Sequence, residues 1–158
     1  MPEQKREKGF TLIEVVAVLI LFAIISAVVV SSMTSTAEVD IKAKAEALKN
    51  HIRYVQMRAM NADADTSTCS ASFGISMSAN SYFMFRNCDK TRKVSLPGAD
   101  TLDVPLTNAT LSPSADVTFD TWGRPCSDLY GSTLYTVNQD FAFGSETIRI
   151  TKNTGYVP

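Results

Sequence analysis

The stretch GFTLIEVVAVLILFAIISAVVV, residues 9–30, decides how this chain is organised. From residue 10 onward it is apolar at every position except Thr11, Glu14 and Ser26. Built as an α-helix, residues 10–30 extend about 31 Å, close to the thickness of a bilayer core of about 30 Å. A single acid in hydrocarbon is costly unless a partner pairs with it. The stretch therefore predicts a membrane-spanning helix whose carboxylate, Glu14, needs a partner.

A short polar segment, MPEQKREKG, precedes the apolar stretch and carries Lys5, Arg6 and Lys8. Basic residues that flank a membrane helix stay on the cytoplasmic side, so the C-terminal part is expected across the membrane. A conventional secretory signal has a shorter apolar core, followed by a small-x-small cleavage site. The long apolar stretch and the lack of a clear site of that kind disfavour a conventional secretory signal.

The helix is predicted to continue far beyond the membrane. Neither proline nor glycine occurs between Phe10 and Met60, which predicts one uninterrupted helix. The segment VVVSSMTST, residues 28–36, is its predicted weak point, because β-branched residues and serines lower helix propensity. In the second half, apolar residues recur at spacings of four and three, which is one face of a helix: Ile41, Ala45, Leu48, Ile52, Val55 and Ala59.

The remaining residues favour a small β-rich head. The chain has 158 residues and a net charge of −1, so the part after the apolar stretch suffices for one domain but not for two. The apolar stripe of the helix needs a partner, which an antiparallel sheet with one apolar face supplies. The predicted fold class is therefore α+β, a long N-terminal helix packed on a small antiparallel sheet. Runs of strand composition between turn residues lie at 70–77, 81–86, 93–96, 116–120, 133–139 and 146–151.

Three cysteines, Cys69, Cys88 and Cys126, bear on the compartment of the head. None forms a C-x-x-C pair, so a zinc site is not expected. In an exported head, one disulfide and one leftover thiol are the natural outcome. Cys69 and Cys88 flank the expected hairpin, so this pair is favoured, and closing its loop is worth roughly 3 kcal/mol. Pairing of Cys88 with Cys126 stays open as the alternative.

Residues typical of catalysis are sparse. His51 is the one histidine of the chain and no G-x-S-x-G motif occurs, which leaves no credible catalytic triad. We therefore expect no enzyme activity, no cofactor and no metal. His51 is interpreted as a solvent-facing side chain on the helix.

Two further groups of residues have a functional and a structural interpretation. Lys90, Arg92 and Lys93 gather in CDKTRKV, residues 88–94, where a solvated loop is favoured over a contact with nucleic-acid phosphates. Trp122 and Tyr130 are interpreted as packing side chains rather than as an adhesive surface.

The basic leader, the motif Gly9-Phe10-Thr11-Leu12-Ile13-Glu14 and the apolar helix follow one another in an order that resembles the type IV pilin superfamily. All six motif residues match the GFTLIE pattern of that family. The layout of a long N-terminal helix followed by a small β-rich head is similar to it as well.

The resemblance implies how the chain is processed and assembled. In that family a prepilin peptidase cuts after the glycine and methylates the new N-terminus, which implies cleavage between Gly9 and Phe10 and N-methylation of Phe10. The acid of the motif pairs with the N-terminal amine of a neighbouring subunit, a role that the resemblance gives to Glu14. The implied partners are other pilin subunits, the prepilin peptidase and an inner-membrane platform protein. The implied location is the bacterial inner membrane with a periplasmic head, then a surface pilus or a periplasmic pseudopilus.

The resemblance also implies a domain order and a function. The expected order is a leader at 1–9, a membrane and filament-core helix at 10–36, an amphipathic helix at 37–62 and a head at 63–158. The expected function is that of a structural subunit, a pilin or minor pilin, of a type IV pilus-like filament. Two alternatives stay open, a pseudopilin of type II secretion and a DNA-binding minor pilin of an uptake pilus.

Two segments of the head resemble a narrower group within the superfamily. They are VTFDTWGRP at residues 117–125 and ETIRITKNTGYV at residues 146–157. Both are similar to pseudopilin H of type II secretion and to minor pilins of the FimT kind.

Overall fold

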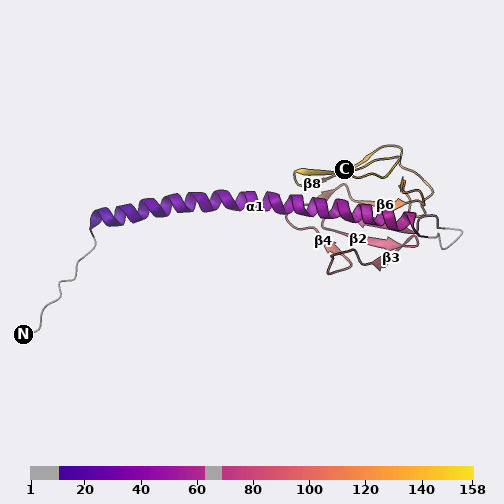
Figure 1. Cartoon of the computed structure of the whole chain (residues 1–158), viewed down its shortest axis with the longest axis horizontal. Helices are drawn as coiled ribbons and strands as arrows, with labels where there is room; N and C mark the ends of the chain where they lie inside the picture. Colours follow the sequence, from indigo (N-terminus) through magenta and orange to yellow (C-terminus); the bar gives the residue numbers. More distant parts are fainter. Residues whose placement is uncertain (1–10, 63–68) are drawn as a thin grey trace, which may run out of the picture. The chain divides into compact units, whose positions relative to one another are not determined.

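The computed structural model describes residues 11–62 and 69–158, which form one long helix and two antiparallel sheets (Figure 1). The chain divides into two compact units, Met1–Ala37 and Glu38–Pro158. The helix α1, Leu12–Met60, belongs to the first unit up to Ala37 and to the second from Glu38. The predicted fold class, α+β with a long N-terminal helix and antiparallel sheet, is confirmed.

Sequence composition explains why α1 runs for 49 residues. No proline or glycine interrupts it, and its terminal charges suit the helix dipole, with Glu14 in the first turn and Arg58 in the last. The helix continues through residues 28–36, so the predicted weak point does not interrupt it.

Antiparallel pairing organises the second unit. The larger sheet has the strand order β3-β2-β1-β6-β7, with β4 also paired to β2, and the smaller sheet has the order β5-β8-β9. In the larger sheet Ile75 lies opposite Met84 on one side and Val117 on the other, so one face is apolar across three strands. The strands are β1 Phe73–Met77, β2 Ser81–Arg86, β3 Asp89–Val94, β4 Val104–Pro105, β5 Leu111–Ser112, β6 Ala115–Phe119, β7 Pro125–Cys126, β8 Gln139–Phe143 and β9 Glu146–Ile150.

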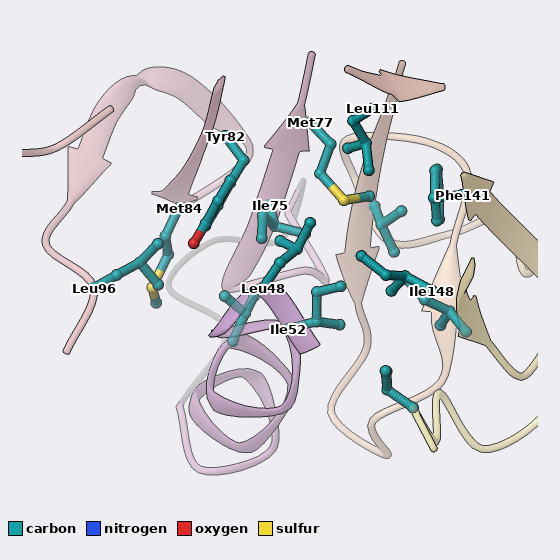
Figure 2. Packing of buried hydrophobic residues seen from close by; sticks show 14 of the residues in the cluster. Leu48, Ile52, Ile75, Met77, Tyr82, Met84, Leu96, Leu111, Phe141 and Ile148 are labelled. Carbon is teal, nitrogen blue, oxygen red and sulfur yellow. The ribbon is translucent and has the colours of Figure 1, made fainter. Parts of the chain in front are cut away.

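The predicted stripe of α1 forms the centre of the core. Figure 2 shows Leu48 and Ile52 pointing from α1 toward side chains of the strands, among them Ile75. Both sheets contribute to this one cluster, because Phe141 and Ile148 of the smaller sheet belong to it as well. The stripe residues retain at most 1% of their exposure, apart from the partly buried Ile41: Ala45, Leu48, Ile52, Val55 and Ala59.

Four predicted strands match β1, β2, β6 and β9, but two predictions need correction. The strand expected at 93–96 lies earlier, as β3, because Asn87 and Cys88 form a tight turn with φ of 54° and 56°. The usual sequence signal for such a turn is Asn-Gly, which is absent here. The prediction of a strand at 133–139 is wrong, because Leu134 makes only an isolated β-bridge to Cys126.

The strand β8 lies just after the wrongly predicted one. Two features account for it, the burial of its aromatic side chains and the turn that follows it. Phe141 and Phe143 alternate with exposed residues and are fully buried. Gly144 then turns the chain into β9 with φ of 60°, and a Cβ there would lie 3.0 Å from Ile41 Cγ2. Glycine therefore allows both the left-handed backbone and the close approach of this hairpin to α1.

Leu48→Ala is expected to lower the free energy of unfolding by about 2–5 kcal/mol, because it leaves a cavity in the core. Val39→Ala is the control, since Val39 lies on the same part of α1 and retains 62% of its exposure. Its expected effect is within about 0.5 kcal/mol. Urea denaturation of the full chain in detergent micelles, followed by circular dichroism, measures both. Equal effects of the two substitutions would contradict the packing described.

Candidate functional site

Glu14 lies in the first turn of α1, two residues after the helix begins. The N–H groups of Glu14 and Val15 donate to the Thr11 carbonyl at 3.1 and 3.3 Å, so the carboxylate projects from a formed helical turn. Glu14 is exposed, and no ion pair within residues 11–62 and 69–158 includes it. Its carboxylate is accessible to a partner outside these residues.

Apolar side chains surround Glu14 and continue along α1. Glu14 shares one shallow hollow with Val15, Val18 and Leu19. Exposed apolar side chains on all sides of a helix favour contact with other apolar surfaces, such as further helices. The large apolar side chains of this part retain 43–83% of their exposure: Leu12, Ile13, Val15, Val16, Val18, Leu19, Ile20, Leu21, Phe22, Ile24, Ile25 and Val29.

The N-terminal sequence matches a known family model. Residues 4–30 match the model described as the prokaryotic N-terminal methylation motif, which includes residues 9–14 and the apolar stretch. The match confirms the resemblance to the type IV pilin-like superfamily, and it identifies the N-terminus as that of a pilin-like precursor. Such a precursor is processed by a prepilin peptidase and assembled with other pilins. Comparisons with curated proteins and with solved structures gave no match.

Two sets of predictions concern the N-terminal part of the chain, namely the cleavage and methylation sites and the membrane span. Gly9 and Phe10, the predicted cleavage and methylation positions, lie outside the described residues. Within the described part of the chain, no helix has the length and apolar character of a membrane crossing. The span over residues 10–30 and the narrower likeness to pseudopilin H and FimT stay predictions.

A disulfide joins Cys69 to Cys88, with the two Cα atoms 6.0 Å apart. This is the pair that the sequence analysis favoured. Cys126, the alternative partner, is a buried free thiol. The bridge ties the chain just before β1 to the tight turn between β2 and β3.

His51 is not solvent-facing, which corrects its interpretation from the sequence. Its Nε2 lies 3.0 Å from the Pro97 carbonyl and its Nδ1 lies 2.8 Å from the Tyr82 hydroxyl. Because a carbonyl only accepts, Nε2 donates to Pro97, and in this tautomer Nδ1 accepts a hydrogen bond through the hydroxyl proton of Tyr82. Burial raises the pKa of Tyr82 to about 12, which keeps that proton in place. His51 therefore fastens α1 to the head.

Two other polar residues of α1 have a similar role that the sequence analysis missed. Arg53 donates from Nε and Nη2 to the Val157 carbonyl, at 3.0 and 2.8 Å. Gln56 Nε2 donates to the carbonyls of Gly123 and Thr154, at 2.8 and 2.7 Å. Their position directly beside the apolar stripe is the signal that would have indicated contact with the head.

The basic residues of β3 are ion-paired. Lys90 Nζ lies 2.7 Å from Asp116, Arg92 Nε lies 3.4 Å from Asp89, and Lys93 Nζ lies 2.6 Å from Asp103. Affinity for nucleic acid depends on positive charge that is free to replace phosphate counterions. These pairings weigh against a nucleic-acid contact at β3.

The interpretation of the two aromatic residues as packing side chains is wrong. Trp122 retains 77% of its exposure and Tyr130 retains 57%. Both lie in turns of the head, after β6 and after β7 respectively. An exposed tryptophan is unusual enough in a folded head to need an explanation of its own.

Cys126 is expected to resist alkylation while the head is folded. Burial, and then the carboxylates of Asp120 and Asp128, raise the pKa of its thiol to about 11, so the reactive thiolate is scarce at pH 8. Iodoacetamide at pH 8, followed by intact mass spectrometry, is expected to add no group to the native chain and one group in urea without reductant. Equal labelling rates in the two conditions would contradict the burial of Cys126.

Proposed function

We propose that this protein is a structural subunit of a type IV pilus-like filament, assembled through the N-terminal half of α1 after removal of the leader. The observation that carries the proposal is the exposed apolar surface of α1 with Glu14 at its start, directly within the methylation motif. No catalytic step is assigned to the chain. Its role is assembly.

The apolar surface gives a physical reason for filament formation. Apolar side chains on all sides of a helix are stable in lipid, and they are equally stable against the same helix of neighbouring copies. A filament therefore offers the N-terminal half of α1 an environment as apolar as the membrane that it leaves. The head has a core of its own, formed within the single chain.

Glu14 then determines how neighbouring helices align. Cleavage after Gly9 creates an amine at Phe10, which is the cation that a carboxylate among apolar side chains requires. A charge pair is strong in a medium of low dielectric constant, and leaving one partner unpaired there costs about 3–5 kcal/mol. The pair would therefore favour the single alignment in which amine and carboxylate meet.

The head is proposed to reach an oxidising compartment. The Cys69–Cys88 disulfide supports this location, because such bonds persist in the periplasm and at cell surfaces and are rare in the cytosol. The precursor is proposed to reside in the inner membrane with its head in the periplasm. Fibres that contain the protein would distinguish a pilus subunit from a secretion pseudopilin, whose deletion stops exoprotein release.

The mature protein is expected to have the mass of residues Phe10–Pro158 plus one methyl group. The reason is cleavage after Gly9 followed by N-methylation, as the motif implies. Intact mass spectrometry of the protein purified from membranes or fibres measures this directly. A mass that begins at Met1, or near Ala37, would contradict the proposal.

Glu14→Gln is expected to be processed normally but to reduce filament yield at least about tenfold, because one member of a buried charge pair is lost. Glu38→Gln is the matched control, since Glu38 is an exposed acid on the same helix beyond the apolar half. The ratio of sheared fibres to membrane-bound subunit measures assembly. Normal yield from Glu14→Gln would refute the pairing role.

A further inference from the structure

Trp122 has no role in the proposed assembly. It is the single tryptophan of the chain and retains 77% of its exposure. Tryptophan usually buries most of its large ring, so leaving it in water forgoes considerable stabilisation. The turn that carries Trp122 and the hollow beside it indicate a class of ligand for this side chain.

A buried carboxylate holds the turn that carries Trp122. Asp120 is 7% exposed, and its Oδ1 accepts hydrogen bonds from the N–H groups of Trp122 and Arg124 at 3.0 and 2.8 Å. Its Oδ2 accepts from Arg124 Nε at 2.7 Å. The Gly123 N–H also donates to the Asp120 carbonyl, at 2.9 Å. The turn is therefore ordered before any ligand arrives.

A hollow of about 370 Å³ lies beside this turn, lined by Trp122, Arg124, Asn153 and Thr154. The hollow is shallow and open to solvent, and its four lining residues are all exposed, so a ligand would lie on it rather than inside a closed cavity. The two loops that form the hollow are fastened to the same side chain, because Gln56 donates to the carbonyls of both Gly123 and Thr154.

Two polar side chains of the hollow have hydrogen-bonding groups that a ligand could use. In the described part of the chain, neither the Asn153 amide nor the terminal nitrogens of Arg124 make a hydrogen bond. The Arg124 charge is matched by Asp120, so the hollow has little attraction for a free anion. The site thus combines one flat apolar ring with donors and acceptors at its edge.

We propose that this hollow binds saccharide, with Trp122 as the surface on which one pyranose ring stacks. A pyranose has C–H groups on its faces and hydroxyl groups around its rim, which matches an exposed indole bordered by Arg124, Asn153 and Thr154. An apolar ligand would cover the Asn153 amide and the terminal nitrogens of Arg124 without pairing them, which is costly, whereas Thr154 and Arg124 Nε already have partners. A filament of such subunits would present the site in many copies.

Trp122 also reports on the site, because all tryptophan fluorescence of the chain comes from it. The full chain, in a zwitterionic detergent without a sugar headgroup, is titrated with maltose, lactose or N,N′-diacetylchitobiose. At least one of these is expected to give a saturable blue shift of the emission, which glycerol at equal osmolality does not give. No saturable shift with any of the three would overturn the proposal.

Asn153→Ala is expected to weaken the apparent affinity about tenfold, since it removes one hydrogen-bonding group. Lys152→Ala is the matched control, an adjacent exposed residue that does not line the hollow, and it is expected to leave the affinity unchanged. Equal affinities for Asn153→Ala and the unmodified chain would overturn the assignment.

Acrylamide quenching tests whether another protein covers the site instead. In assembled fibres without saccharide, quenching of Trp122 by acrylamide is expected to be as efficient as in the detergent-solubilised subunit. Loss of quenching on assembly would mean that a neighbouring copy occupies the hollow, and it would overturn the saccharide proposal while leaving filament assembly intact.

Discussion

Burial of the apolar stripe of α1 is the interaction on which the arrangement of the head depends. Leu48 and Ile52 lie at the centre of a single cluster to which both sheets contribute. The side chains beside the stripe then determine where the loops lie, because His51, Arg53 and Gln56 each bond to backbone carbonyls far along the chain. The apolar face of the helix thus packs against the sheets, and the polar residues at its edges make the specific hydrogen bonds to the loops.

The same helix has two different surfaces along its length. Its large apolar side chains from Leu12 to Ile25 are exposed, whereas the stripe residues from Ala45 to Ala59 are buried. The first pattern needs an apolar environment from outside the chain, and the second obtains one from the sheets. The residues that form the core of the head and those proposed to mediate filament assembly are therefore different residues of one continuous helix.

The spacing of apolar residues predicted the helix and its buried face, because a long segment with helical periodicity and no proline or glycine has few alternatives to a helix. The Cys69–Cys88 pair followed from the hairpin between the two residues. Turns, strands and hydrogen bonds that depend on individual long-range contacts could not be predicted from the spacing of residues. The turn at Asn87 and Cys88 lacks its usual glycine, and β8 depends on Phe141 and Phe143 reaching the core. The partners of Gln56 lie 67 and 98 residues away, which no local pattern reveals.

The disulfide has a mechanical consequence for a subunit under tension. The covalent path for a force that pulls the two ends of the chain apart runs from Cys69 to Cys88 through the sulfur atoms, so such a force cannot extend the chain between them, which includes β1 and β2. The sequence separation of 19 residues corresponds to about 60–70 Å of extended chain. That length cannot be released by stretching while the bond is intact, so β1 and β2, which contribute Ile75 and Met84 to the core, are protected.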